Sequence, residues 1–240
     1  MLNPWTQLPK TPPYVLPCDE ASIGAFNSKH PERDLQLWTD RFPEPFLGRP
    51  DAPLVLLNGN PGSNPDLDAD SIKFNEADHP ALEKARHNLL HEQLDYPFWT
   101  LDPAFAGTGE GENVEYPGRT WWRKRLRRLI ESCEPDGIRN VANRLLCVEF
   151  FPYHSQSFSS FPRLASQEYS FHLVAAAMQR NAVIVVMRSK RLWFQAVDRL
   201  KDYPKCYTLK NPQSPYLSET NCSNTHDWQQ ICHAIGETSK

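Results

Sequence analysis

The sequence lacks the patterns of a membrane or secreted protein. Its 240 residues contain no apolar run close to the roughly 20 residues that a membrane-spanning helix needs. The opening stretch, MLNPWTQLPKTPP, also lacks the charged-then-apolar order of a signal peptide. We therefore expect a cytoplasmic protein that does not bind membranes and that shows no sign of an obligatory protein partner.

Cysteines are few and scattered. The six of them form no C-x-x-C pair and no Cys/His spacing of the zinc-finger type, so we expect no metal and no other cofactor. One alternative stays open in HNLLHEQ, where His87 and His91 lie one helical turn apart. With His79 or Glu83 they would form a hydrolase metal site, although such a pair is more often a polar helix face.

Nucleotide-binding loops are also missing. The apolar run LVLL is followed by NGNPGSNPD, which has neither the G-K-[ST] ending of a P-loop nor the G-x-G-x-x-G of a dinucleotide site. Pro61 removes a backbone N–H that a phosphate cradle would use. The loop therefore does not predict a nucleotide cofactor, and an ordinary structural turn remains possible.

Net charge is only -3, but the charges are segregated along the chain. Residues 66–115 carry twelve acidic and three basic side chains, whereas GRTWWRKRLRR places six bases within residues 119–128. Such a cluster suits a polyanion, and Trp121 and Trp122 beside it favour nucleic acid. We therefore predict DNA as a partner, although a solvated helix face is the simpler alternative.

The chain predicts an extended arm followed by an α/β domain. Ten prolines fall within the first 53 residues, so we assign residues 1–52 to a Pro-rich N-terminal arm that packs on the domain, with one short helix around Leu35 to Arg41. Residues 53–240 form the predicted domain, with an insertion at about 77–118.

The predicted domain alternates strands with helices. Its four β-like runs are PLVLL, RLLCVEFF, AVIVVM and KCYTL. Helical patterns separate them, which predicts an α/β three-layer sandwich with a central four-stranded, parallel-rich sheet flanked by helices. Ligands of such sheets bind beyond the carboxyl ends of the strands, so the loops after these runs are the places to look for a site.

Two of those loops carry a family resemblance. GNPG after the first run and NPQSPYLS after the last resemble the two signature motifs of the uracil-DNA glycosylase superfamily, nearest to its mismatch-specific and single-strand-selective branches. Asn58 stands where these branches have a leading Gly. The resemblance implies a uracil-DNA glycosylase-like fold and an enzyme, a DNA N-glycosylase that flips a base out of the duplex and hydrolyses its N-glycosidic bond.

The same resemblance assigns roles to individual residues. Asn60 matches the catalytic place that positions a water, and Asn211 matches the place that stabilises the leaving base or sugar. The base-binding positions implied are Gly59, Pro61, Gly62, Phe74 and Glu149. The wedge and DNA-backbone positions predicted are Ser214, Pro215, Tyr216, Leu217, Arg123 and Arg127.

Glu149 departs from the family pattern and changes the expected substrate. The family has an Asn there that reads uracil, whereas a carboxylate can only accept and therefore suits the N4 amino group of cytosine. The register leaves alternatives open, because Val148 or Phe150 could occupy the position and Glu149 could instead pair with Arg144.

The insertion extends this argument to modified bases. It contains aromatic and acidic side chains that resemble a sugar-binding surface, namely Tyr96, Phe98, Trp99, Asp102 and Phe105. The hypothesis is a glycosylase of antiviral defence acting on a modified cytosine such as glucosylated hydroxymethylcytosine of phage DNA. The alternatives are a uracil or mismatch-specific repair glycosylase and a catalytically silent DNA-binding module of the same fold.

Overall fold

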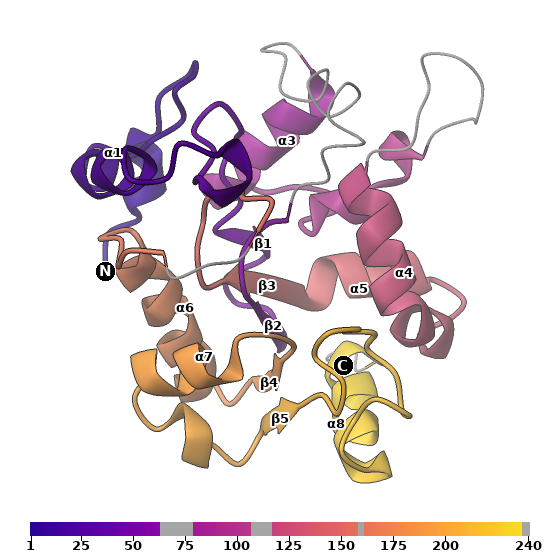
Figure 1. Ribbon diagram of the computed structural model, residues 1–240. Helices are drawn as coiled ribbons and strands as arrows, with labels where there is room; N and C mark the ends of the chain where they lie inside the picture. Colours follow the sequence, from indigo (N-terminus) through magenta and orange to yellow (C-terminus); the bar gives the residue numbers. More distant parts are fainter. Residues whose placement is uncertain (63–78, 107–116, 158–160, 237–240) are drawn as a thin grey trace.

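A central β-sheet organises the molecule. The computed structural model describes residues 1–62, 79–106, 117–157 and 161–236 (Figure 1). In sequence order the strands are β1 (Phe46–Gly48), β2 (Leu54–Asn58), β3 (Leu145–Glu149), β4 (Val183–Val186) and β5 (Cys206–Thr208). Their order in the sheet is β1-β3-β2-β4-β5; β1 runs antiparallel to β3, and the other neighbours are parallel.

The prediction of an α/β fold with a helix-flanked sheet is confirmed, but the predicted number of strands is wrong. The sheet has five strands and is mixed, because the Pro-rich arm supplies β1. Three residues between Pro45 and Pro50 form this strand at the sheet edge, where proline next to a strand is tolerated. Gly48 has φ 101° and lies so close to the Leu145 carbonyl that a Cβ would collide with it.

Helices cover the sheet on two sides. The helices described are α1 (Glu20–Asn27), α3 (Pro80–Leu89), α4 (Pro117–Ser132), α5 (Gly137–Arg144), α6 (Gln167–Gln179), α7 (Lys190–Ala196) and α8 (Thr225–Gly236). Figure 1 shows α6 and α7 on one side of the strands and α4, α5 and α8 on the other. None of the described helices is long and apolar enough to cross a membrane.

Short 3-10 helices complete the element list. They are η1 (Pro4–Gln7), η2 (Arg33–Leu35), η4 (Trp99–Leu101), η5 (Pro103–Phe105) and η6 (Leu200–Asp202). The helix predicted around Leu35 to Arg41 is wrong, because the α-helix of the arm lies earlier, at α1, and only η2 reaches Leu35.

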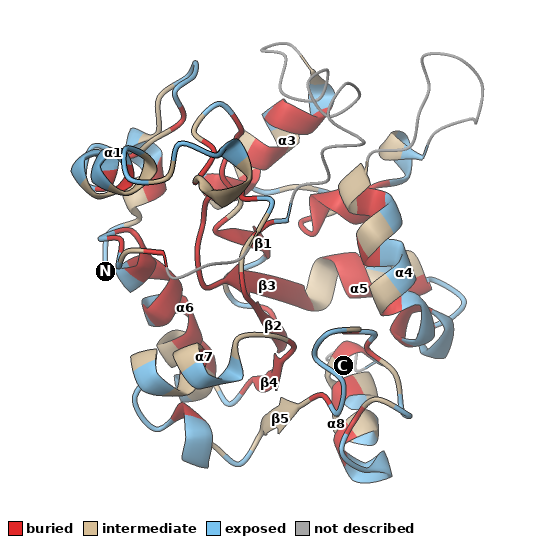
Figure 2. Ribbon diagram, in the orientation of Figure 1, coloured by how far each residue is buried: buried red, intermediate tan, exposed pale blue. Residues whose placement is uncertain are grey.

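The core fills both faces of the central strands. Every residue of β2, β3 and β4 is buried, which is the continuous burial expected of parallel strands covered on both sides (Figure 2). The arm joins the same core through Trp5, Tyr14 and Leu16, each at most 2% exposed. Burial of these side chains holds the arm against the strands.

Candidate functional site

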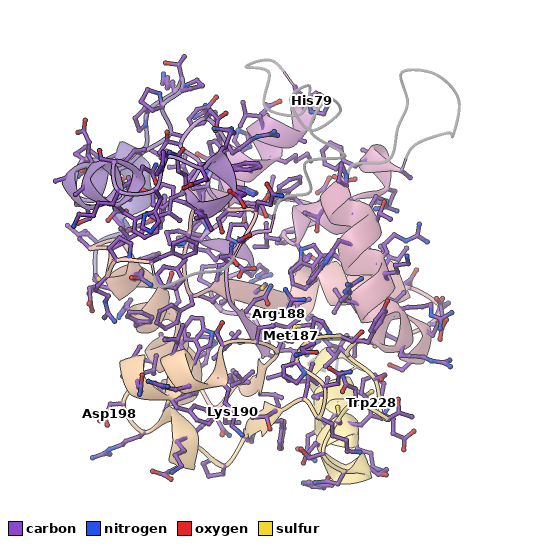
Figure 3. All side chains as sticks on the ribbon, in the orientation of Figure 1. His79, Met187, Arg188, Lys190, Asp198 and Trp228 are labelled. Atoms are coloured by element: carbon purple, nitrogen blue, oxygen red, sulfur yellow. The ribbon has the colours of Figure 1, made fainter. Side chains whose placement is uncertain are left out.

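The strand order reverses at β2, which has β3 on one side and β4 on the other. In open α/β sheets, ligands bind in the crevice beyond the carboxyl ends of the strands at such a switch point. Here β2 ends at Asn58 and β3 at Glu149, while Arg188 follows β4. Figure 3 shows Arg188 near the middle of the molecule, whereas Asp198 lies at its periphery.

Asn58 and Glu149 form a buried polar pair. They are register partners in the parallel ladder, and the Asn58 Nδ2 donates to Glu149 Oε1 at 2.9 Å. The two residues are only 4% and 6% exposed. The Trp193 indole Nε1–H donates to the Asn58 carbonyl at 2.7 Å, and the Glu149 N–H donates to the Pro45 carbonyl at 2.9 Å, so both ends of the pair are fixed.

Each member of the pair keeps one polar atom without a partner among the described residues. These atoms are Asn58 Oδ1 and Glu149 Oε2, and both are shielded from solvent. Buried polar atoms are normally hydrogen-bonded, so an unsatisfied pair at a switch point indicates a place for a polar ligand. Arg144 does not take the place of Asn58 as the partner of Glu149, because the Arg144 Nε donates to the Ala234 carbonyl instead.

Burial raises the pKa of Glu149 from 4.5 to about 8. The Asn58 hydrogen bond lowers this pKa, the charge of Glu44 raises it, and the charge of Arg188 lowers it. At pH 7 the Glu149 side chain is therefore largely neutral. This corrects the reasoning from an acceptor-only carboxylate: with Oε1 accepting from Asn58, the neutral acid presents Oε2 as an O–H donor.

Asn60 lies beyond this pair on the loop after β2. Its Nδ2 donates to the Ser155 hydroxyl at 2.8 Å and to the Pro61 carbonyl at 3.2 Å. Ser155 is 1% exposed, so the amide is anchored to the segment that follows β3. Asn60 itself is half-buried, and its orientation is set by Ser155.

The other loop positions predicted to bind the base surround Asn60. Gly59 and Pro61 are buried, and the Gly59 carbonyl accepts from the Phe151 N–H at 2.8 Å. Gly62 is exposed and forms a parallel bridge with Ser155. The structure thus ties this loop to the β3 side of the switch point. Phe74 lies outside the described residues.

The second motif loop is held by its own amides. Asn211 Oδ1 accepts from the backbone N–H groups of Gln213 and Ser214, each at 3.2 Å. Asn221 accepts from the Asn211 N–H at 2.9 Å and donates to the Tyr216 carbonyl at 2.9 Å. The Asn211 side chain therefore shapes this loop, and the structure does not place it beside the Asn58–Glu149 pair.

The predicted wedge divides into an exposed and a buried half. Tyr216 is 39% exposed, while Leu217 is 0% exposed and donates its N–H to the Arg125 carbonyl at 2.9 Å. Pro215 is also buried. The Leu217 side chain is part of the core, so of the two predicted wedge residues only Tyr216 is exposed in this structure.

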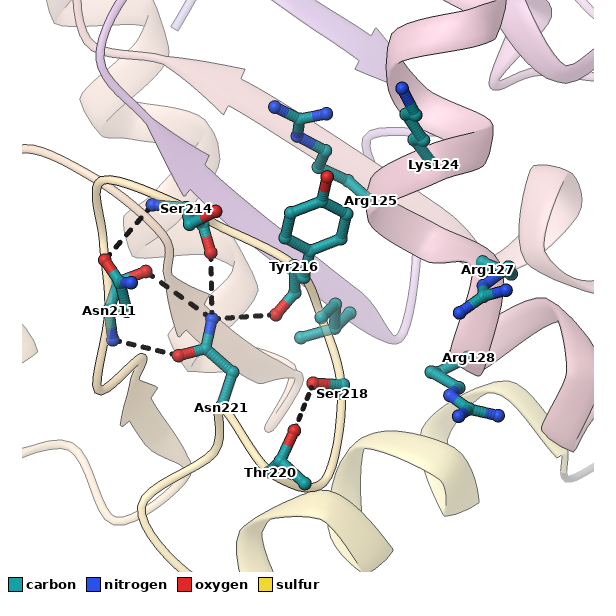
Figure 4. Close-up of a pocket in the computed structure, with 11 residues that line it drawn as sticks. Lys124, Arg125, Arg127, Arg128, Asn211, Ser214, Tyr216, Ser218, Thr220 and Asn221 are labelled. Carbon is teal, nitrogen blue, oxygen red and sulfur yellow. Dashed lines mark hydrogen bonds between the residues drawn. The ribbon is translucent and has the colours of Figure 1, made fainter.

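A basic pocket opens between α4 and this loop (Figure 4). Its volume is about 450 Å³. It is lined by Lys124, Arg125, Arg127, Arg128, Asn211, Ser214, Tyr216, Leu217, Ser218, Thr220 and Asn221. None of these lining residues is acidic, so the pocket favours an anion. Arg123 is exposed on the same helix but does not line the pocket.

Arg125 lies between two aromatic rings. Its guanidinium carbon is 4.6 Å from the Trp121 ring centroid and 4.8 Å from that of Tyr216, within the range of cation–π attraction. Trp122 instead packs in the core and is 5% exposed. The two adjacent tryptophans therefore differ: Trp122 packs in the core, and Trp121 lies beside Arg125, which lines the pocket.

Arg188 connects the pocket loop with the buried pair. Its Nη2 donates to the Gln213 carbonyl at 3.4 Å, and its charge acts on Glu149. Burial lowers the pKa of Arg188. The two polar regions therefore belong to one edge of the sheet, linked by a single cation.

The structure also bears on the alternative metal site at His87 and His91 and on the hypothesis of a sugar-binding surface. Among the described residues no cluster of three or more metal-ligating side chains occurs, and the His91 Nε2 lies 2.6 Å from the Tyr169 hydroxyl instead of beside His87. Phe98 and Trp99 are 0% and 2% exposed, so they belong to the core and cannot form an exposed sugar-binding surface.

Comparison with known proteins gives no further guide. No family model, no curated protein and no solved structure matches this chain. Residues that the sequence reasoning did not assign, Asn58, Ser155 and Arg188, complete the site. Asn58 carries the one signal that was readable in advance: like Glu149, it is a polar residue that ends an otherwise apolar run.

Proposed function

We propose that the protein is a DNA base glycosylase that hydrolyses the N-glycosidic bond of a flipped cytosine-type base and leaves an abasic site. The single observation that carries this proposal is the buried Asn58–Glu149 pair at the switch point, whose Oδ1 and Oε2 atoms have no hydrogen-bond partner among the described residues. One acceptor and one donor complement the edge of cytosine, whose N4 amino group donates and whose N3 accepts.

The neutral form of Glu149 also suits the chemistry. As the bond between C1′ and the base breaks, the electron pair moves onto the base, and an O–H donor at N3 stabilises the negative charge that develops there. Asn60 lies on the loop that follows β2, with its Nδ2 bonded to Ser155. Its Oδ1 is the acceptor that would orient the water that attacks C1′.

Base release from DNA with cytosine, methylcytosine, hydroxymethylcytosine and glucosylated hydroxymethylcytosine tests the proposal. Abasic sites are read as strand breaks after alkali. Asn60→Ala should slow release on the order of a hundredfold, the loss typical of removing one polar group that serves the transition state. Asn143→Ala, which removes an amide on α5, should keep the wild-type rate. Equal rates for the two variants would contradict the role of Asn60.

The neutral Glu149 also favours a second candidate, a uracil or mismatch glycosylase. Uracil offers O4 as an acceptor and N3–H as a donor. The Glu149 Oε2–H would donate to O4, and the Asn58 Oδ1 would accept from N3–H. Ionised Glu149 would present acceptors alone and repel O4. Because both binding modes use the Oε2–H, release of either base should fall as the pH rises through about 8, so the identity of the released base separates the two candidates.

A third candidate, a DNA-binding module without catalysis, is favoured by one observation. Asn211 Oδ1 is bonded to two backbone N–H groups, so the amide at the second catalytic place serves the loop. Such a module would bind DNA and release no base from any member of the substrate panel.

A further inference from the structure

The basic pocket is a separate site from the Asn58–Glu149 pair. Its walls are α4 and the loop of residues 211–221, and neither member of the pair lines it. Four cationic side chains stand on the α4 wall, and hydroxyl and amide groups stand on the loop wall (Figure 4). Cations with short neutral donors are the groups that hold phosphate oxygens in proteins.

The neighbouring acid does not close the pocket. Glu131, one turn further along α4, lies 3.0 Å from Arg128 and 3.8 Å from Arg127. All three side chains are about half exposed or more, and ion pairs of this kind are weak in water. A phosphate can therefore compete with Glu131 for both arginines.

A stacking surface adjoins the cations. Tyr216 lines the pocket, is 39% exposed, and has the Arg125 guanidinium over its ring, with Trp121 next to the same guanidinium. Exposed aromatic rings beside a basic groove are the parts with which proteins hold unpaired nucleotides. A concave pocket of about 450 Å³ has the size of a small-molecule site and admits a splayed nucleotide, whereas a regular duplex presents its phosphates on a convex surface.

We propose that this pocket binds a phosphate of single-stranded DNA, with an adjacent base stacked on Tyr216. The proposal rests on the proposed function for the identity of its ligand, and it adds that the protein engages an unpaired strand. Lys124 and Arg128, one helical turn apart on the pocket wall, supply the charge, and Tyr216 supplies the stacking surface.

Fluorescence anisotropy with an unmodified labelled oligonucleotide, as single strand and as duplex, tests this site without any base excision. The single strand should bind more tightly. Tyr216→Ala should weaken single-strand binding on the order of tenfold, the loss expected for one stacked base, whereas Tyr216→Phe should keep the wild-type affinity. Thermal unfolding of both variants checks that the fold is unchanged.

Salt titration tests the charges. The double variant Lys124→Gln, Arg128→Gln should bind the single strand more weakly and lower the slope of log K against log salt by roughly 0.7, the value for the loss of one phosphate contact. Lys201→Gln removes one exposed charge from η6, away from the pocket, and should leave both affinity and slope unchanged.

The outcomes separate the two proposals. Equal binding of duplex and single strand, or no effect of Tyr216→Ala, would overturn the single-strand site. A free nucleoside monophosphate that displaces the oligonucleotide at comparable concentration would also overturn it and assign the pocket to a small ligand. Tight, Tyr216-dependent binding without release of any base would support the single-strand site and contradict the glycosylase. Base release that is unaffected in every pocket variant would support the glycosylase and contradict the single-strand site.

Discussion

Two polar regions on the same edge of the sheet differ in their solvent exposure and in their charge. The Asn58–Glu149 pair is nearly inaccessible to solvent, and its acid is largely neutral at pH 7. The pocket on α4 is open and lined by four cations. Burial makes each hydrogen bond of the pair selective, because an unmatched polar atom is costly there. The open position of these cations suits attraction of a polyanion through its phosphates, regardless of sequence.

The largest expected effect is the pH dependence of Glu149. Its folded-state pKa is raised to about 8 from 4.5, so the folded protein holds a proton that the unfolded chain releases between these values. Stability from this group is therefore full below about pH 4.5 and is lost as the pH rises toward 8. The loss across this window amounts to roughly 5 kcal/mol.

Glu149→Gln isolates this contribution, since the amide does not titrate. The pH dependence of the unfolding free energy, measured by urea denaturation of both proteins from pH 4.5 to 9, should differ in slope by roughly 1.4 kcal/mol per pH unit within the window. The facing groups Asn58, Cys147, Glu44 and Arg188 are the same in both proteins, so their effects largely cancel. Parallel profiles would show that Glu149 is not a buried neutral acid.

The adjacent residues Tyr216 and Leu217 show the same contrast between an exposed and a buried position within one loop. Leu217→Ala should lower the free energy of unfolding by about 2 to 5 kcal/mol, because it leaves a cavity in the core. Tyr216→Ala, at a 39% exposed position, should cost much less stability and act mainly on DNA binding. Thermal unfolding separates the two, and equal destabilisation would contradict the division of the loop.

The hydrogen bond of the buried pair gives the next effect. Asn58→Ala leaves Glu149 Oε1 with the weak Cys147 thiol donor in place of the amide and should destabilise the protein by about 1 to 3 kcal/mol. It should also raise the pKa of Glu149 further, because the Asn58 hydrogen bond lowers that pKa. The urea profile of this variant should therefore keep falling at higher pH than that of the wild type, and an unchanged profile would count against the bond.

The smallest stability effect belongs to the exposed region. Glu131→Gln removes the partner of Arg127 and Arg128 and should change the unfolding free energy by only about 0.3 to 1 kcal/mol. The same change should strengthen DNA binding, because both arginines lose a competing carboxylate. Anisotropy titration measures this gain, and weaker binding would show that Glu131 holds the arginines in place for the ligand.

The hydrophobic pattern predicted the parallel part of the fold. The apolar runs beginning at Leu54, Leu145 and Val183 are strands, because strands buried on both faces leave an unbroken apolar signature. The run beginning at Cys206 is also a strand, although its three residues are only half-buried. Strand β1 was missed, since three residues between prolines show no periodicity and their pairing with β3 depends on tertiary structure.

The sequence predicted less of the candidate site than of the fold. Glu149 and Asn60 were predicted, but the protonation of Glu149 follows from burial that no sequence pattern reports. Leu217 resembles an exposed wedge in sequence, and only its packing shows otherwise. The sequence analysis also did not predict Ser218, Thr220 and Asn221, which belong to the loop wall of the pocket. They line a site only because the fold brings this loop against α4.

The most direct test of the central claim is mass analysis of the bases released from a DNA mixture that contains uracil, a mismatched base, and methylated, hydroxymethylated and glucosylated cytosine together. The account predicts release of a cytosine-type base that falls as the pH rises through about 8, with uracil left in the DNA. Release of uracil alone, or of no base while the DNA is still bound, would contradict it.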